Sequence, residues 1–319
     1  MIEKKEVKNM DMYQKRKIRA EKKNNDSQKS FSKVPISWYP GHMAKTKRLI
    51  KENIDKIDVV IEVLDARIPY STKIRDFEEL VQNKPRILVF TKMDLCDKKE
   101  TEKWIKYYEQ LGNVVVALDL EHQPNMHMLL NKIKMVMQET NAKRVAKGMN
   151  IRKTRVLIVG VPNAGKSTLI NRLVGKKVTN VGNKPGVTKE LSWIRIGEDI
   201  ELLDTPGILW PKIADGNIAL NLATFTAIRE EILPIYDVIE YFLLTLQKYY
   251  PNKLKERYGV DIVDDDIINT LDVIGKRRGC LIKGGEIDYD KVIQIIMSDI
   301  KDGSVSGITF DRFEEIINE

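Results

Sequence analysis

Near-continuous apolar runs alternate with amphipathic segments through the first two thirds of the chain. Four of these runs predict buried strands, at 57–67, 86–94, 114–118 and 154–160. Segments with helical periodicity lie between or after them, at 98–111, 124–139 and 166–175. A further strand pair is predicted on either side of the turn Gly197-Glu198-Asp199. This alternation predicts an α/β fold with a mostly parallel sheet that helices cover on both faces.

The pattern divides the chain into three parts. Residues 1–34 are rich in Lys and Arg and lack apolar periodicity, which predicts a mobile basic arm. The strands and helices above fill residues 35–214, with a polar connector expected at 139–153. One more helix is expected near the start of this part, with an apolar face made of Met43, Leu49, Ile50 and Ile54. Residues 215–319 have helical patterns at 217–232, 237–250, 264–279 and 289–303, which predict a separate α-helical domain.

Composition narrows the class of protein. The chain has 319 residues, 42% hydrophobic and 31% charged, as in a globular protein. No apolar run approaches the ~20 residues that cross a bilayer, and the N-terminus lacks the apolar core of a signal peptide. Only Cys96 and Cys280 are present, in no metal-binding or disulfide spacing, so we expect a reduced, cytoplasmic monomer without a membrane partner. The net charge of +8 favours a nucleic-acid or anionic-surface partner, although a solvated Lys-rich surface explains it equally well.

The segment GVPNAGKST, residues 160–168, matches the phosphate-binding pattern G-x-x-x-x-G-K-S between a predicted strand and a predicted helix. In such loops, backbone N–H groups and the helix N-terminus surround the β-phosphate. Lys166 would neutralise β- and γ-phosphate oxygens, and the Ser167 hydroxyl would ligate Mg²⁺. The nucleotide-binding residues predicted here are Gly160, Asn163, Ala164, Gly165, Lys166, Ser167 and Thr168.

Two further segments fit the same site. Asp204 ends an apolar strand in LLDTPG, where a carboxylate holds the water shell of Mg²⁺, and the Gly207 N–H can reach the γ-phosphate. Thr188, in NKPGVTKE, either closes over Mg²⁺ as a second ligand when GTP is bound or belongs to a turn before the next strand. Ile208 stands where Ras-like enzymes carry a water-orienting Gln, so we expect slow hydrolysis by the protein alone.

The base is predicted to be read by an earlier segment. Thr91, Lys92, Met93 and Asp94 follow an apolar strand in the pattern N/T-K-x-D. A carboxylate at Asp94 can accept two N–H bonds from guanine, a pair that adenine lacks, so the sequence predicts GTP rather than ATP. Lys92 is expected to lie against the base and the sugar. A backbone contact to guanine O6 is expected near Ala117, without a matching motif.

The order of these segments is reversed relative to ordinary GTPases, in which the phosphate loop precedes the guanine box. Here the guanine box, at 91–94, comes before the phosphate loop at 160–168. The order predicts a circularly permuted Ras-like P-loop GTPase domain, followed by a C-terminal α-helical domain. Permutation is tolerable because domain termini often lie close together at the surface. As a consequence, the chain after DTPG runs directly into the helical domain.

The succession TKMD, GVPNAGKS, GVT and DTPG resembles the circularly permuted GTPases, and specifically the YlqF/RbgA branch, the ribosome biogenesis GTPases A. The closer resemblance rests on WYPGHMAK at 38–45, DARIP at 65–69 and KRRGCLIKGGEIDYDK at 276–291. It runs from about Trp38 to the C-terminus. It implies a GTPase, slow alone and stimulated by the large ribosomal subunit, that assists late maturation of that subunit and contacts its rRNA partly through the helical domain.

Two residues acquire roles only through resemblance. His42, in the Pro-Gly-His segment, is expected to orient the attacking water once the ribosomal partner orders this segment; a structural or RNA-contacting histidine is the alternative. Asn163 resembles the ligand of a K⁺ ion that bridges the phosphates, or else is a hydrogen-bonding loop residue. His122 and His127 are expected to lie far from the nucleotide boxes. Asp65 and Arg67 carry no assigned role.

RNA contact is expected from the basic arm and from residues of the helical domain. The basic residues concerned are Lys253, Lys255, Arg257, Lys276, Arg277, Arg278 and Lys283, and the tyrosines that would stack on bases are Tyr249, Tyr250 and Tyr258. A solvated charged face is the alternative. Two other function classes compete: a non-ribosomal regulatory GTP-binding switch with protein partners, and an RNA-modifying enzyme, for which the sequence offers no catalytic domain.

Overall fold

The computed structural model describes residues 41–75, 77, 81, 84–122, 124–179, 192–207, 213, 215–228 and 234–318, and of Gly41 and His42 it describes the backbone only. The predicted arm at 1–34 lies outside these residues, as do Thr188 and Ile208.

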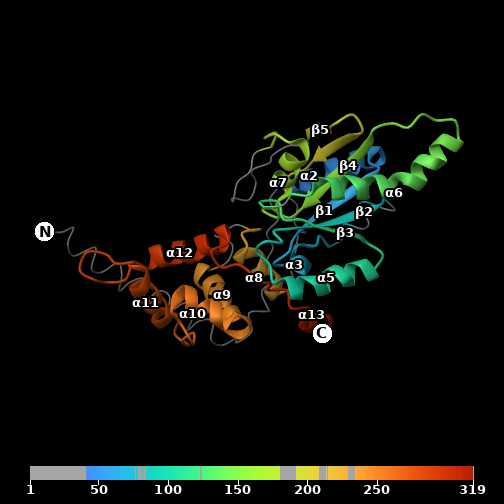
Figure 1. Ribbon diagram of the computed structural model, residues 1–319. Helices are drawn as coiled ribbons and strands as arrows, with labels where there is room; N and C mark the ends of the chain where they lie inside the picture. Colours follow the sequence, from blue (N-terminus) through green and yellow to red (C-terminus); the bar gives the residue numbers. More distant parts are fainter. Residues whose placement is uncertain are drawn as a thin grey trace.

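A six-stranded sheet with the order β3-β2-β1-β4-β6-β5 forms the centre of the larger part of the molecule (Figure 1). Its strands are β1 (Val59–Asp65), β2 (Arg86–Thr91), β3 (Val114–Ala117), β4 (Thr154–Gly160), β5 (Ser192–Ile196) and β6 (Ile200–Asp204). Neighbouring strands are parallel except for the antiparallel pair β5–β6 at one edge. All seven residues of β1 are buried, as expected of a central strand with both faces covered.

The sheet pairing confirms the permuted order. β1 lies between β2 and β4, so the strand before the guanine box and the strand before the phosphate loop flank the same neighbour. The strands that come first in the chain therefore complete one side of the sheet, and β4 to β6 complete the other.

Helices cover both faces of the sheet. α6 (Met126–Ala146) and α7 (Lys166–Val174) contribute to the cluster that includes the inward residues Val59, Ile61 and Ile158. The opposite face carries two smaller clusters, one with α2 (Gly41–Asn53) and the 3₁₀ turn η1 (Ile54–Lys56), the other with α5 (Lys98–Gln110). The short α3 (Pro69–Thr72) follows β1.

The second part is helical and lies beside the carboxyl end of the sheet (Figure 1). Its helices are α8 (Gly216–Thr224), α9 (Ile235–Tyr249), α10 (Pro251–Tyr258), α11 (Ile267–Arg278), α12 (Tyr289–Asp302) and α13 (Phe313–Ile317). The largest cluster of buried hydrophobic residues runs from the sheet into α8, α9, α11 and α12 without a break. The division into domains at 35–214 and 215–319 stays a prediction. None of the described helices is long and apolar enough to span a membrane.

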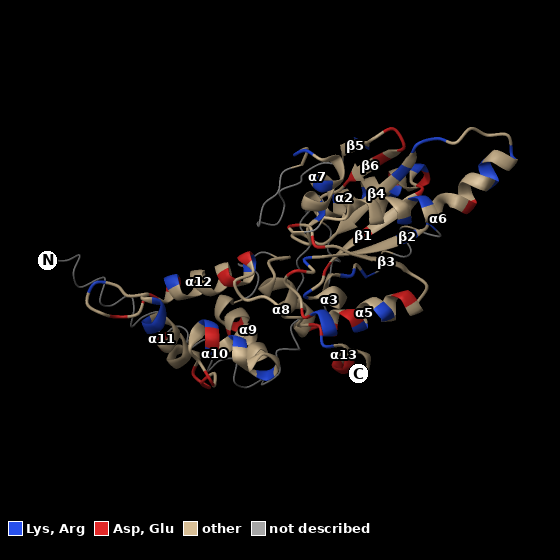
Figure 2. Ribbon diagram, viewed as in Figure 1, with Lys and Arg blue, Asp and Glu red and all other residues tan. Residues whose placement is uncertain are grey.

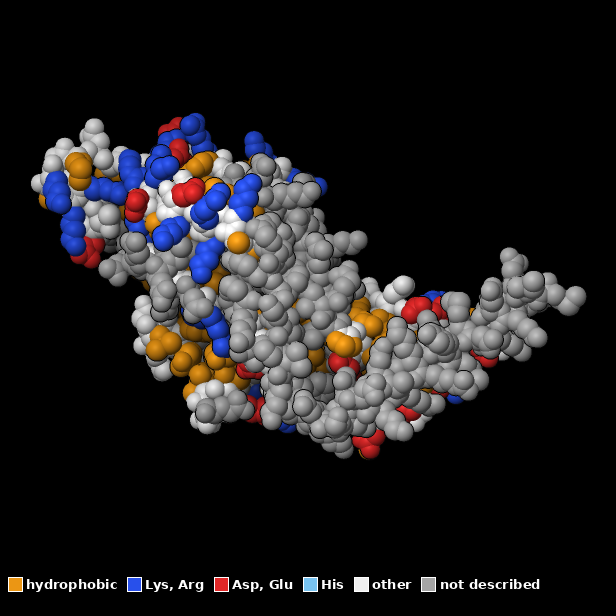
Figure 3. Space-filling model, turned by 180° about the vertical axis from the view of Figure 1, so that it is seen from behind, with side chains coloured by type: hydrophobic (Ala, Val, Ile, Leu, Met, Phe, Trp, Pro, Cys, Tyr) orange, Lys and Arg blue, Asp and Glu red, His pale blue; other side chains and the backbone are white. Residues whose placement is uncertain are grey.

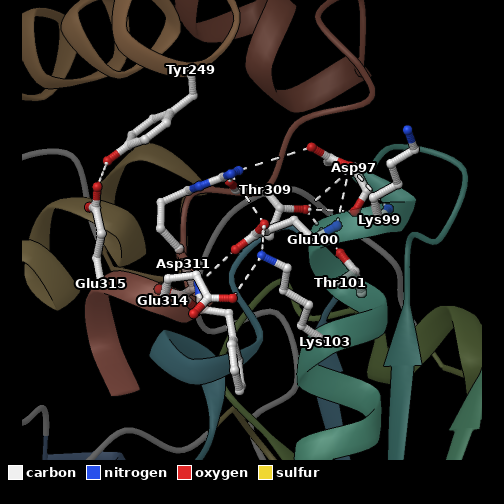
Figure 4. Close-up of polar contacts among 12 residues, drawn as sticks. Asp97, Lys99, Glu100, Thr101, Lys103, Tyr249, Thr309, Asp311, Glu314 and Glu315 are labelled. Atoms are coloured by element: carbon white, nitrogen blue, oxygen red, sulfur yellow. Dashed lines mark hydrogen bonds and ion pairs between the residues drawn. The ribbon is translucent and has the colours of Figure 1, made fainter. Parts of the chain in front are cut away.

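The C-terminal segment returns to the first part and packs on α5 (Figure 4). The Trp104 indole donates to Asp311 O at 2.8 Å, and the Arg312 guanidinium lies 3.1 Å from a Glu100 carboxylate oxygen. Asp97 caps the N-terminus of α5 and also accepts a hydrogen bond from the Tyr250 hydroxyl at 3.1 Å. The end of the chain therefore ties the helical part to the sheet domain.

Three expectations about the helices were wrong. The polar stretch predicted as a connector from residue 139 is helical as far as Ala146, because it contains no Gly or Pro before Gly148 and Glu139 pairs with Lys143 one turn away. The helix predicted at 217–232 ends at Thr224. The segment that follows the proline at 251 forms α10, which the pattern did not predict.

Candidate functional site

Four strands deliver the predicted nucleotide segments to one edge of the sheet. In the register, Asp65 pairs with Thr91, and Asp204 pairs with Ile158, two residues before the end of β4. Because all four strands run parallel, the guanine box, the phosphate loop and the DTPG segment leave the sheet on the same side. Ligands of open α/β sheets bind at this carboxyl edge.

The phosphate loop rests on the guanine-box strand. Gly165 has φ = 94° and begins α7, and a Cβ atom there would lie 3.2 Å from Thr91 Oγ1. The Thr91 hydroxyl donates to Ala164 O at 2.6 Å and is fully buried. The Thr91 side chain therefore supports the phosphate loop, and the lack of a side chain at Gly165 allows the loop to approach the guanine-box strand.

Lys166 is buried at the start of α7. Its ammonium donates to Gly160 O at 3.0 Å and to Val161 O at 3.2 Å, so it folds back over the loop. Burial lowers the pKa of Lys166 to about 8, and the charge of Asp204 opposes this shift. The anionic phosphates expected at the loop would favour the charged form.

Asp204 fits a cation. It is buried, and neither carboxylate oxygen has a hydrogen-bond partner among the described residues. Burial raises the pKa of Asp204 to about 6, although the charge of Lys166 lowers it. An oxygen-binding cation such as Mg²⁺ would satisfy these oxygens through its water shell, with the half-buried Ser167 as the second protein ligand.

The DTPG segment packs directly on the phosphate loop. The Thr205 hydroxyl donates to Ile158 O at 2.8 Å, which ties the segment to β4. A Cβ atom at Gly207 would lie 2.7 Å from Pro162 N, so only glycine fits this approach. Gly207 is therefore held beside the loop, in keeping with the predicted contact to the γ-phosphate.

Lys92 connects the guanine box to the phosphate loop. Its ammonium donates to Asp65 Oδ2 at 2.6 Å and to Asn163 O at 2.7 Å. Burial lowers the pKa of Lys92, and Asp65 opposes this shift. Burial alone would raise the pKa of Asp65, but the charges of Arg67 and Lys92 hold it well below its usual range. The side chain of Lys92 thus bridges two segments that lie far apart in the sequence.

Asp65 and Arg67, which had no role in the sequence analysis, form the centre of this edge. Arg67 makes two hydrogen bonds to the Asp65 carboxylate, at 3.0 and 2.8 Å, and both side chains are 3% exposed. Arg67 also donates to Ile300 O at 3.0 Å, at the end of α12, and its guanidinium lies 4.3 Å from the ring centroid of Phe225. A polar residue at the end of a buried strand was the available sequence signal for Asp65, and the same signal marks Thr91.

The loop after β3 reaches the guanine box, so the expectation that His122 lies far from the boxes was wrong. The ligand atoms of Asp94, Asp119 and His122 all lie within 4.8 Å of one another. Asp119 Oδ1 accepts the backbone N–H groups of Glu121 and His122, which folds this loop towards Asp94. Burial and the Asp119 charge raise the pKa of Asp94, while a hydrogen bond from its own backbone opposes the shift. Asp94 is the expected guanine acceptor, so the sequence predicts a base and not a metal at this cluster.

The structure also places the remaining residues that the sequence analysis singled out. The backbone of His42 lies in the first turn of α2 and not in a loop, while His127 is exposed on α6. Met93 and Thr168 are half-buried at the edge of the site. The N–H of Leu118 donates to Phe90 O in the sheet, so the N–H of the preceding Ala117 points to the open edge, which does not favour a guanine contact.

The tyrosines expected to stack on RNA bases have internal partners. Tyr258 is fully buried, so the expectation that it stacks on bases was wrong. The Tyr250 hydroxyl lies 3.1 Å from Thr309 O, and the Tyr249 hydroxyl donates to Glu315 (Figure 4). Aromatic residues near basic ones in the sequence here fill the junction between α9, α10 and the C-terminal segment.

Comparison with known proteins agrees with this geometry. A family model described as 50S ribosome-binding GTPase matches residues 155–276. Ribosome biogenesis GTPase A of Bacillus cereus is 44% identical over 280 residues, which cover 88% of this chain and 95% of that protein. The protein of the same name from Thermotoga maritima is 30% identical, over 88% of this chain and 96% of its own length.

Two solved structures of YlqF from Thermotoga maritima are similar to this chain over most of its length. The GNP-bound structure has 26% identity and a TM-score of 0.57, and covers 84% of this chain and 98% of its own. The GDP-bound structure has 25% identity and a TM-score of 0.59, and covers 84% of this chain and all of its own.

Replacing Asp94 by Asn should change the base that the protein binds. The amide offers a donor where guanine needs an acceptor, so we expect the affinity for GDP to fall at least ~100-fold and that for XDP to rise. Titration with fluorescent GDP and XDP measures both. Asp261→Asn, at an exposed aspartate far from the site, is the matched control. GDP affinity unchanged in Asp94→Asn would exclude Asp94 from base recognition.

Nucleotide binding should take up protons near pH 8. In the free protein, the pKa of Lys166 is about 8, and bound phosphates raise it, so a lysine that is partly neutral becomes charged on binding. The affinity for GDP should therefore fall as the pH rises above about 8. Calorimetric titrations at pH 8 in Tris and in HEPES should give different apparent enthalpies. Equal enthalpies in the two buffers would contradict a titrating Lys166.

Proposed function

The chain belongs to the ribosome biogenesis GTPase A family, and from this premise we propose that it acts in late maturation of the large ribosomal subunit, which it contacts through rRNA. That it is a GTPase acting in ribosome biogenesis follows from the family. The observation that carries the proposal for this chain is the Lys92 bridge, because it joins the guanine box to the phosphate loop beside the attachment of the helical part.

The expected chemistry is hydrolysis of GTP to GDP and phosphate. Asp94 selects guanine, the N–H groups of the loop at 160–168 bind the phosphates, and Lys166 neutralises their charge. Ser167, Asp204 and Thr188 are the residues proposed to hold Mg²⁺ or its waters, and Mg²⁺ would neutralise charge that develops between the β- and γ-phosphates. Asp204 supports this role because its buried oxygens have no partner among the described residues.

Two residues are proposed to assist hydrolysis in place of the water-orienting Gln of Ras-like enzymes. His42 is our candidate for orienting the attacking water, from the first turn of α2. Asn163 is our candidate ligand for K⁺, since a neutral amide oxygen beside phosphate oxygens is a donor set that suits a large monovalent cation. Neither group replaces the ribosomal particle, which we propose orders the segment around His42.

The proposed rRNA contact uses exposed basic residues. Four of these lie at the end of α11 and in the turn that follows: Lys276, Arg277, Arg278 and Lys283 (Figure 2). α2 adds exposed lysines and an arginine on the GTPase part: Lys45, Lys47, Arg48 and Lys51. Seen from behind, Lys and Arg side chains gather over the sheet domain (Figure 3). Phosphate contacts of this kind provide affinity without sequence selection.

Purified large ribosomal subunits should accelerate GTP turnover in KCl, because the particle completes the catalytic site. His42→Ala should bind GTP normally but lose this acceleration, and His127→Ala, an exposed histidine on α6, should keep it. Single-turnover hydrolysis with and without the particle measures the effect. Full stimulation of His42→Ala would remove this residue from the mechanism. No stimulation of the unaltered protein, with GTP bound tightly, would instead support a non-ribosomal switch.

A further inference from the structure

Three residues other than glycine have a positive φ in the part of the chain that the structure describes. They are Lys92 at 58°, Asn163 at 60° and Thr226 at 61°. This left-handed conformation is costly for side chains with a Cβ atom, and most costly for β-branched ones such as threonine. Strained residues of this kind cluster at functional sites when the surrounding contacts hold them.

The three strained residues form one hydrogen-bonded chain across the nucleotide edge. The Lys92 ammonium donates to Asn163 O at 2.7 Å. The Asn163 amide nitrogen then donates to Thr226 O at 2.7 Å and lies 3.0 Å from Thr226 Oγ1. Because a backbone carbonyl can only accept, the Asn163 side-chain amide can take only one orientation. Its Nδ2 atom faces Thr226, and its Oδ1 atom points away from Thr226.

Thr226 occupies a position that glycine normally fills. The Thr226 N–H donates to Ala223 O and the Ala227 N–H donates to Leu222 O, which is the Schellman pattern at the end of α8. The other described helices that end in a left-handed residue have glycine there: Gly112, Gly148, Gly175, Gly259, Gly279 and Gly303. At α8 the strained left-handed residue is a threonine, and this residue bonds to Asn163 of the phosphate loop.

We infer that Thr226 is a positioning residue for the phosphate loop. Its carbonyl and hydroxyl oxygens hold the Asn163 amide nitrogen, and so direct the amide oxygen of Asn163 to the nucleotide. Thr226 is 6% exposed and lies next to Phe225, whose ring lies under the Arg67 guanidinium. The C-terminal end of α8 thereby sets the geometry of the loop. This inference rests on the proposed nucleotide-binding role of Asn163.

Three substitutions of Thr226 separate positioning from packing. Thr226→Val keeps the shape but loses the hydroxyl, Thr226→Ser keeps the hydroxyl, and Thr226→Gly loses the hydroxyl while relieving the strain. Thr224→Val, which removes a neighbouring buried hydroxyl that has no hydrogen-bond partner among the described residues, is the matched control. Fluorescent GDP dissociation, the ratio of turnover in KCl to that in NaCl, and the melting temperature of the nucleotide-free protein are measured for each.

We expect Thr226→Val to release GDP about 3- to 10-fold faster, as one hydrogen bond predicts, and to lose much of the K⁺ response. Thr226→Ser should match the unaltered protein. Thr226→Gly should show the same functional loss as Thr226→Val with an equal or higher melting temperature, because strain at the helix end is relieved. Stability and function that move in opposite directions exclude general unfolding.

The outcomes distinguish this inference from the K⁺ proposal. Equal turnover in KCl and NaCl for the unaltered protein would remove the K⁺ role of Asn163, while faster GDP release in Thr226→Val would still support positioning. Unchanged GDP release and K⁺ response in Thr226→Val would overturn the inference. Slower release or higher turnover in that variant would also overturn it, since Thr226 would then restrain the loop.

Discussion

The buried ion pair between Asp65 and Arg67 is the interaction on which the rest of this structure depends. Through Asp65 it holds the Lys92 ammonium, which in turn holds the phosphate loop at Asn163 O. Through Arg67 it holds the helical part, because the guanidinium donates to Ile300 O and the Arg67 carbonyl accepts the Phe310 N–H. Removal of one partner from such a pair leaves an uncompensated buried charge, typically at a cost of about 3–5 kcal/mol. Nucleotide site and helical part therefore share one electrostatic centre.

The permuted order gives this centre its significance. In the sheet, β1 lies between the strand that ends in the guanine box and the strand that ends in the phosphate loop, so Asp65 leaves the sheet between the two. The DTPG segment, which packs on Pro162 through Gly207, is followed in the chain by α8. Thr226, two residues after the end of α8, returns to the phosphate loop. The segment expected to respond to the γ-phosphate thus begins and ends against the same loop.

Much of the site could be predicted from the sequence, because each box directly follows an apolar strand. The parallel register then brings Thr91, Gly160 and Asp204 to one edge whatever the details of packing. Four helices of the second part, α8, α9, α11 and α12, were likewise visible as amphipathic segments. Roles such as those of His42 and Thr188 stay predictions, since the side chain of one and the whole of the other lie outside the described residues.

What the sequence did not reveal depends on contacts between distant segments. Asp119 and His122 reach Asp94 only because the loop after β3 folds back on the carboxylate of Asp119. Tyr258 is buried by the packing of α10, which no local pattern signals. Thr226 has no motif at all: its importance lies in a backbone angle and in a partner 63 positions away.

The nucleotide site and the helical part form one unit, and amide hydrogen exchange of the full chain, free and bound to GDP, tests this most directly. We predict that GDP slows exchange in the phosphate loop and also at two amides of the helical part. These are the N–H of Ala227, which closes the end of α8, and the N–H of Phe310, which bonds to Arg67 O. Protection confined to residues 91–94 and 160–168 would contradict it.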